Sequence, residues 1–426
     1  MKKILLLLLL CISLKIAAQK LTIEETKIIN EINKQMPQTL RMLEQLVNIN
    51  SGTNNLEGVR EVGAILRKEF DKIDFTTQWI TLPDSLKRAG HLVANINGKK
   101  GKKLFLIGHL DTVFEPDMPA NPYKKINAST ATGQGVVDMK GGNMIIISAL
   151  QALYKLGYLK NTTITAYFTG DEEKSGKPTS VSRADFIERA KQADIALGFE
   201  GGSLTTVAAA RRGTSHWQLT TTGRQAHSAG IFTAGYGSIY EAARIINTFR
   251  EQLGKEKYLT FNPGFVIGGS EIKYDSAKIY GEVSGKTNII SPVTVVQGDL
   301  RFLTEAQKNS ARVKMKKIAA TDNLKGTSAK IVFAEGIPAM EPTPGNNALV
   351  QILNRVSIDM GIGQTKAGDP GSRGAGDISY IAKYVDCLDG LGASGSGAHA
   401  PGEIINLKEF PILIQRAAIF IYRLTR

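Results

Sequence analysis

Hydrophobic and polar residues alternate with two different periods along the first half of the chain. Residues 21–50 and 56–70 carry apolar side chains at three- and four-residue spacing, which predicts two helices. Further on, short runs rich in β-branched and aromatic residues predict strands. The expected strands are 91–96, 103–108, 163–169 and 194–199, and the expected helices between them are 143–158 and 183–192. Strands that alternate with helices indicate an α/β fold, with a mostly parallel sheet and helices on both faces.

The pattern changes near Val207, where the order of elements becomes that of a small α+β unit. Its expected strands are 216–222, 265–272 and 293–302, and its expected helices are 237–253 and 305–324. The α/β pattern then returns, with a strand after residue 330, helices at 347–360, 378–383 and 407–424, and a strand at 387–391. We therefore expect a main domain in two parts, 19–208 and 325–426, with an inserted domain at 209–324.

The first eighteen residues have the composition of a cleavable signal peptide. Lys2 and Lys3 precede an apolar run at 4–14, and Ala17 and Ala18 supply small residues for cleavage. The run is too short to span a bilayer, so no stable membrane span is expected. We expect an exported protein, periplasmic or secreted. Two alternatives stay open: a lipid anchor at Cys11, which the bulky preceding residue disfavours, and a retained N-terminal anchor.

Composition excludes several classes of protein. The 426 residues are 42% hydrophobic and 22% charged, which is typical of globular domains and not of disordered or collagen-like chains. Removing residues 1–18 takes away three lysines, so the charge of +14 becomes 50 − 39 = +11. The basic clusters at 99–103 and 314–317 have no aromatic residues between the lysines, so no nucleic-acid partner is expected. Only Cys387 would remain, and it cannot form an internal disulfide.

Histidines and acids follow the expected strands. The strand at 103–108 ends in His109 and Asp111, two residues apart and so on the same face, where a carboxylate can orient an imidazole for a metal. A strand end with a hydrogen-bonded histidine is the alternative. Asp138 lies in a glycine-rich loop just before a helix, where it could also act as a helix cap.

Three further segments carry four candidate residues. Glu172 and Glu173 come after the strand at 163–169, and on extended backbone their side chains point to opposite sides. An exposed acidic turn is the alternative for this pair. Glu200 ends another apolar strand, and His399 lies in a glycine-rich loop. Strand ends of an open α/β sheet converge on one crevice, and such histidines and carboxylates suit two divalent ions of the zinc type.

At this point the chain resembles a known family. The motifs are GHLDTVF, GVVDMKGG, TGDEE, GFEGG and GAHAPGE. Together they resemble the dinuclear-zinc hydrolases that include glutamate carboxypeptidase, aminoacylase and succinyl-diaminopimelate desuccinylase. The resemblance implies that His109, Asp138 and Glu200 bind one zinc, and that Asp138, Glu173 and His399 bind the other. It implies that Glu172 is the general base and Asp111 the carboxylate that orients a ligand. It also implies a non-proline cis peptide after Asp138.

The resemblance extends to the inserted domain, for which it implies a dimerisation or lid role and a homodimer. His227, in GRQAHSAG, resembles the histidine that reaches a neighbouring active site and stabilises the transition state. Asn288 and Arg301 resemble residues that bind the substrate's carboxylate, a task that suits the arginine fork. A turn histidine and a surface salt bridge are the alternatives for His227 and Arg301.

One motif departs from the family pattern, because Gly376 replaces a threonine and a nearby basic residue is shifted. This departure puts glutamate-type specificity in doubt and leaves the metal chemistry untouched. We expect a zinc-dependent, carboxypeptidase-like hydrolase of short peptides or N-acyl amino acids. Aminoacylase activity, dipeptidase activity and a non-catalytic binding protein are the alternatives. The chain has neither the Gly-x-Ser-x-Gly motif of serine hydrolases nor a His-Glu-x-x-His motif.

Overall fold

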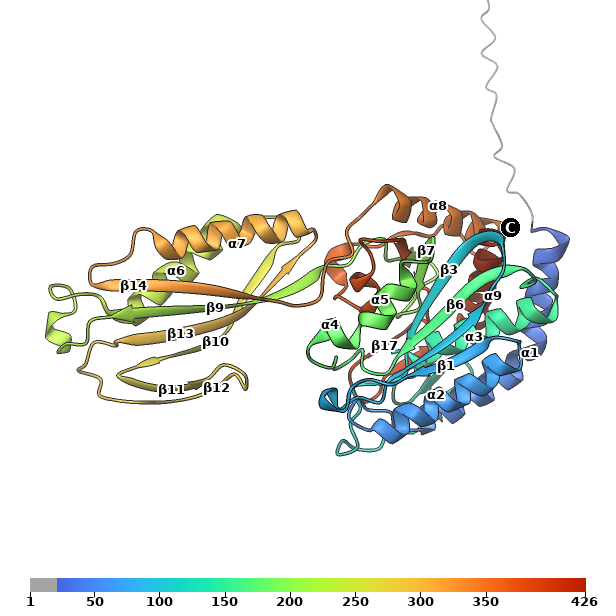
Figure 1. Ribbon diagram of the computed structural model, residues 1–426, viewed down its shortest axis with the longest axis horizontal. Coiled ribbons are helices and arrows are strands. Elements are labelled where there is room, and N and C mark those ends of the chain that lie inside the picture. Colours follow the sequence, from blue (N-terminus) through green and yellow to red (C-terminus); the bar gives the residue numbers. More distant parts are fainter. Residues whose placement is uncertain (1–20) are drawn as a thin grey trace, which may run out of the picture.

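The computed structural model describes residues 21–426, which fold into a larger and a smaller domain (Figure 1). The predicted signal peptide at 1–18, with its two alternatives, lies outside the described residues. Among residues 21–426 no helix is long and apolar enough to cross a membrane.

The larger domain is built on a six-stranded sheet in the order β1-β2-β6-β3-β7-β16. Its strands are β1 (Thr76–Ile80), β2 (His91–Ile96), β3 (Lys100–His109), β6 (Thr162–Thr169), β7 (Ile195–Gly198) and β16 (Asp386–Leu388). The four strands β6, β3, β7 and β16 are parallel, while β1 and β2 pair antiparallel at one edge. The mixed α/β fold with a mostly parallel sheet is therefore confirmed.

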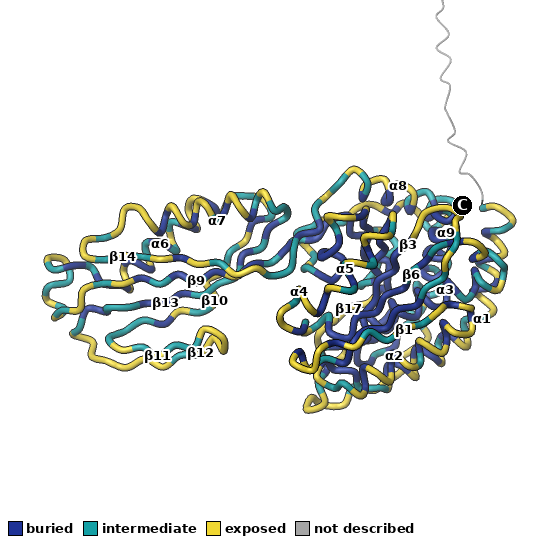
Figure 2. Tube along the Cα trace, viewed as in Figure 1, coloured by how far each residue is buried: buried dark blue, intermediate teal, exposed yellow. Residues whose placement is uncertain are grey.

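Helices cover both faces of this sheet, so the second half of strand β3 is buried on both sides. Leu104 and Leu106 pack into one core, and Phe105 and Ile107 pack into another on the opposite face. The helices of the larger domain are α1 (Ile23–Asn48), α2 (Leu56–Asp71), α3 (Lys140–Lys155), α4 (Thr179–Ser182), α5 (Ala184–Ala190), α8 (Pro344–Asp359) and α9 (Phe410–Leu424). Figure 2 shows the buried residues concentrated along the strands of this domain.

Short elements complete the larger domain. A small sheet has the order β17-β18-β5-β4, and β8 pairs with β15. These strands are β4 (Lys124–Lys125), β5 (Thr130–Thr132), β8 (Thr206–Val207), β15 (Lys366–Ala367), β17 (Gly395–Ser396) and β18 (Ile404–Asn406). The 3-10 turns are η1 (Asp84–Leu86), η2 (Ser228–Gly230), η3 (Pro370–Ser372) and η4 (Asp377–Tyr380), of which η2 lies in the smaller domain. The helix predicted at 378–383 is instead the 3-10 turn η4, and Ile378 and Ile381 are buried in the core that also contains Phe105.

The smaller domain is a four-stranded antiparallel sheet in the order β10-β13-β9-β14, with two helices on one face (Figure 1). Its elements are β9 (Gly213–Gly223), α6 (Gly237–Leu253), β10 (Thr260–Gly269), the hairpin β11 (Glu271–Asp275) and β12 (Tyr280–Ser284), β13 (Val293–Phe302), α7 (Glu305–Ala320) and β14 (Thr327–Glu335). The boundary expected at residue 324 falls just before β14. That strand pairs with β9, so it lies in the smaller sheet and not in the second part of the main domain, 325–426, where its place in the sequence had put it.

Two crossings of the chain join the domains, and they lie side by side. Arg211 and Met340, one on each crossing, exchange backbone hydrogen bonds of 2.9 and 3.0 Å. Both side chains are buried. The two segments therefore form a short antiparallel connection.

Candidate metal centre

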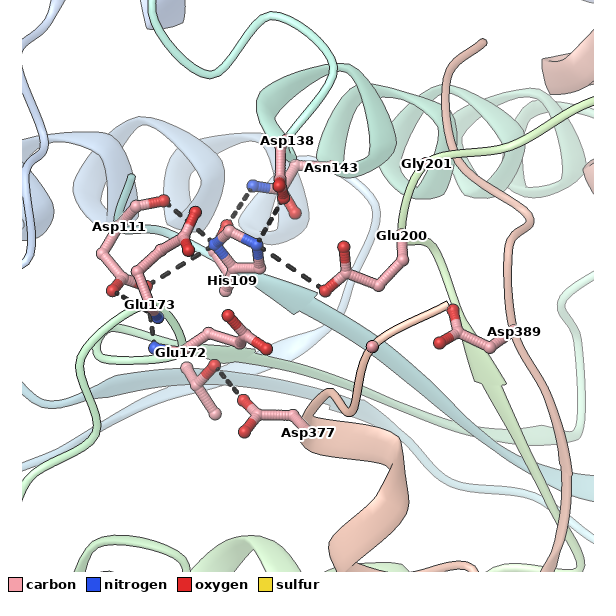
Figure 3. A network of polar contacts seen from close by, with 12 residues as sticks. His109, Asp111, Asp138, Asn143, Glu172, Glu173, Glu200, Gly201, Asp377 and Asp389 are labelled. Carbon is pink, nitrogen blue, oxygen red and sulfur yellow. Dashed lines mark hydrogen bonds and ion pairs between the residues drawn. The ribbon is translucent and has the colours of Figure 1, made fainter. Parts of the chain in front are cut away.

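His109 ends strand β3 and is almost completely buried, with carboxylates from several segments around its ring (Figure 3). Its Nδ1 lies 2.9 Å from the backbone carbonyl of Asp111, which can only accept, so Nδ1 carries the proton. Its Nε2 lies 3.1 Å from Asp138 Oδ1 and 3.7 Å from Glu200 Oε1, and in the neutral ring this nitrogen offers its lone pair on the side of those two carboxylates. The Asn143 amide donates to the His109 carbonyl at 2.6 Å and fixes the end of the strand.

Asp111 acts differently from the sequence expectation. Its carboxylate Oδ1 lies 3.5 Å from His109 Nδ1, farther than its own carbonyl oxygen. The carboxylate instead accepts the backbone N–H of Glu172 at 3.0 Å and of Glu173 at 3.1 Å. It also accepts the hydroxyl of Thr53 at 2.7 Å, a contact between residues 58 positions apart that no local pattern indicates. Asp111 therefore positions the segment that carries both glutamates.

Asp138 precedes helix α3, and its peptide bond to Met139 is cis, as the resemblance implied. Its two carboxylate oxygens face different histidines: Oδ1 faces His109, and Oδ2 lies 2.9 Å from His399 Nε2. His399 has a left-handed backbone, with φ of 66°, in the turn between β17 and β18. Asp138 is thus shared between two groups of candidate ligands.

Glu173 lies beside the second group. Its Oε2 is 3.3 Å from His399 Nε2, and its Oε1 is buried without a hydrogen-bond partner. A buried carboxylate oxygen without a donor is costly, and a cation offsets that cost. The unpartnered oxygen therefore fits a metal ligand.

The electrostatics of the cluster agree with this interpretation. Desolvation and the charge of Glu200 hold the pKa of Glu172 well above its usual range. Desolvation and the charge of Asp138 raise the pKa of Glu200 to about 8. Several carboxylates packed together without a cation repel one another, and divalent ions would remove that repulsion.

Within residues 21–426, three groups of histidine and carboxylate side chains have ligand atoms within 4.8 Å of one another. They are His109 with Asp138 and Glu200, Asp138 with Glu173 and His399, and His109 with Glu172 and Glu173. The first two groups are the two sets that the resemblance implied. The third shows that Glu172 lies close enough to compete for a ligand role.

His227 and Asn288 lie elsewhere, in the smaller domain. A β-bridge between His227 and Ile289 places them together, and both line a cavity of about 520 Å³. His227 follows the end of β9 that is remote from the domain connection, so one chain does not bring it to its own cluster. Arg301 lies at the other end of the sheet, where it pairs in register with Thr214, and its Nε is 3.0 Å from Asp299 Oδ2.

Two buried contacts at the site were missed by sequence reasoning. Glu403 accepts the backbone N–H groups of Gly135, Val137 and Asp138 at 2.9, 2.6 and 2.8 Å. Its position in the same short motif as His399 was the signal that could have revealed it. The other is Arg183, which joins two carboxylates beneath the glutamates.

Comparisons with known proteins agree with the motifs and the fold. Residues 105–423 match the sequence profile of Peptidase family M20/M25/M40. Carboxypeptidase G2 from Pseudomonas sp. (strain RS-16) is 29% identical over 391 residues, which cover 90% of this chain and 88% of that protein.

Two solved structures share the fold. Aminopeptidase PepT from Bacillus cereus superposes with a TM-score of 0.73 at 18% identity, covering 91% of this chain and 98% of that one. The Bacillus subtilis YXEP protein, described as a dinuclear metal binding peptidase, has a TM-score of 0.66 at 13% identity, covering 92% of this chain and 99% of that one. Because the family profile spans most of the sequence and both domains of the fold recur in these structures, the chain belongs to Peptidase family M20/M25/M40, a family of metallopeptidase hydrolases.

Proposed function

We propose that this enzyme cleaves an amide bond in short peptides or N-acyl amino acids, using two divalent ions, Zn²⁺, bound at the cluster. The observation that carries the proposal is the position of Asp138, which presents one oxygen to His109 and the other to His399. A carboxylate that belongs to two ligand sets suits a bridge between two ions. Imidazole and carboxylate donors are those that Zn²⁺ takes in catalytic sites.

The proposed ligands are His109, Asp138 and Glu200 for one ion, and Asp138, Glu173 and His399 for the other. When bound, such ions polarise a carbonyl and make a coordinated water more acidic. Glu403 and Asp111 hold the backbone of the ligand segments by accepting their N–H groups. The ligands are thereby fixed before an ion arrives.

Glu172 is the proposed general base. Its backbone N–H is anchored to Asp111, and its raised pKa reflects a desolvated carboxyl among other acids. A carboxyl in such surroundings can accept a proton from the attacking water and then donate it to the leaving nitrogen. Glu173, anchored by the other oxygen of Asp111, lies against His399 and is left as a ligand.

We propose a carboxypeptidase-like reaction, supported by the similarity to Carboxypeptidase G2. Arg301 would bind the substrate's carboxylate after leaving Asp299. Asn288 lies beside His227 at the other end of the sheet, so it would reach the same carboxylate only from a second copy of the chain. His227 would come from a second copy of the chain, because it lies far from the cluster of its own chain. This requires a homodimer through the inserted domain.

We also propose export, on the basis of the basic and apolar segments in residues 1–18. N-terminal sequencing of protein recovered from the cell envelope and medium tests this point. A mature chain that begins near residue 19 is expected, and an intact N-terminus would contradict it.

The activity is tested with the mature chain loaded with Zn²⁺. It is offered dipeptides, longer peptides with free or amidated C-termini, and N-acetyl amino acids. Release of the C-terminal residue, lost on amidation, supports carboxypeptidase-like activity. Cleavage confined to dipeptides, or to N-acyl amino acids, would assign the dipeptidase or aminoacylase alternative instead. No turnover with both ions bound would contradict all three.

A further inference from the structure

We propose that Arg183 is a positioning residue for hydrolysis: it fixes the segment that carries Glu172 against the turn η4. The inference rests on the proposed role of Glu172 as the base. Arg183 lies between α4 and α5 and is completely buried, as are few arginines in proteins.

The first contact of Arg183 is with the residue directly before Glu172. Its Nη1 donates to Asp171 Oδ1, and its Nη2 donates to the Asp171 carbonyl at 3.1 Å. The other carboxylate oxygen of Asp171 accepts the Gly176 N–H at 2.8 Å and the Ser182 hydroxyl at 2.6 Å. Asp171 therefore links the two ends of the segment 171–176 and ties that segment to the guanidinium group. Glu172 is the second residue of the segment.

The second contact is with η4. Arg183 Nε donates to Asp377 Oδ1 at 2.7 Å, and the other oxygen of Asp377 accepts the Thr169 hydroxyl at 2.6 Å. Thr169 ends β6 and pairs in register with His109. Figure 3 shows Asp377 next to the side chain of Glu172. The glycine-rich segment 368–376 leads directly into Asp377, so Arg183 connects that segment with the base.

The geometry suits arginine and not lysine. One planar guanidinium reaches two carboxylates and a carbonyl in fixed directions, whereas an ammonium group is a single point of charge. A buried ion pair contributes little net stability compared with an apolar replacement. We infer that the ion pairs of Arg183 serve to orient Glu172. Small errors in the orientation of a catalytic group reduce the rate steeply.

The test compares three metal-loaded variants with the wild type. Arg183→Lys keeps the charge and loses the fork, and Thr169→Val removes only the hydroxyl that holds Asp377. Both should retain the wild-type metal content and a KM within about 2-fold, with kcat roughly 10–100-fold lower. If Arg183→Lys does not fold, Thr169→Val alone decides the matter.

Arg423→Lys is the matched control. Arg423 also joins two carboxylates, at 2.6 Å to Glu25 and 2.8 Å to Asp359, but it ties α9 to α1 and α8 and touches no candidate ligand. This variant should lose stability in urea while keeping kcat. A merely structural role for Arg183 would give the same result for both lysine variants.

Three outcomes would overturn the proposal. These are wild-type kcat in Arg183→Lys and Thr169→Val, a fall in kcat that only follows loss of metal, or an equal fall in Arg423→Lys. Glu172→Gln separates this inference from the proposed function. If that variant stays active, the base assignment fails and the positioning role fails with it. If it is inactive while Arg183→Lys and Thr169→Val are normal, the positioning role alone is wrong.

Discussion

Glu403 lies behind Asp138, and its carboxylate accepts the Asp138 backbone N–H at 2.8 Å. The same carboxylate accepts two further N–H groups of the glycine-rich loop, from Gly135 and Val137. Glu403 follows His399 by four residues, so a single segment supplies one proposed ligand and supports another. The backbone segment that carries His399, a ligand of one proposed ion, thereby also holds Asp138, which belongs to both ligand groups.

Glu403→Gln tests this coupling. A carboxamide offers one acceptor oxygen, and its NH₂ group would face an N–H, so at least one contact must be lost. We expect metal affinity to fall roughly 10–100-fold, as for other residues that orient a ligand. Competition with a chromogenic chelator measures it. Unchanged affinity would show that the loop keeps its shape without Glu403.

Glu172→Gln and Glu173→Gln should have opposite effects. The first removes the proposed proton carrier, so kcat should fall by about 10²–10⁴-fold with KM and metal content nearly unchanged. The second removes a proposed ligand and should loosen one ion. Metal analysis beside steady-state kinetics distinguishes them. Loss of metal in Glu172→Gln would reverse the assignment, which the third ligand group makes a real alternative.

His399→Ala should lower metal content and rate together. His399 is more than half exposed, whereas His109 is almost completely buried. We therefore expect the ion at the His399 set to be the more labile one, and the first that a chelator removes. Chelation should abolish activity, and added Zn²⁺ should restore it. A chelator-insensitive wild type would contradict the metal proposal.

Two inactive variants can test whether His227 acts in the site of its own chain or in that of the partner chain. His227→Ala should lose about 10²–10³-fold in kcat, as when one donor to a transition-state oxygen is removed. Co-expressed Glu172→Gln and His227→Ala chains, purified through two different tags, should form a heterodimer with one complete site. Its rate should be about half that of the wild-type dimer. An inactive heterodimer would place His227 in its own site.

The sequence predicted those parts of the site that depend on local patterns, and it did not predict those that depend on contacts between distant segments. His109, Asp138, Glu173 and Glu200 follow strands or begin a helix, and a parallel sheet brings such positions to one edge. Their grouping could be predicted from hydrophobic pattern alone. Arg183 and Asp377 are 194 positions apart, and no local pattern relates them. Their contact depends on the fold as a whole.

In the fold, too, local periodicity predicted the elements but not how distant strands pair. The alternating strands and helices of the larger domain follow from local periodicity. Strand β14 could be recognised as a strand, but its partner β9 is more than a hundred residues earlier. Which sheet a strand joins is decided by pairing and not by its own residues. The boundary at residue 324 differed from the structure for this reason.

The paired crossings at Arg211 and Met340 limit how the smaller domain can move. A single connecting strand can swivel about its own axis, whereas two strands bonded side by side resist torsion and still flex like a ribbon. We therefore expect the smaller domain to swing about that connection more readily than it twists. Arg301, near the connection, would travel little in such a swing, while His227, beyond the far end of β9, would travel much farther.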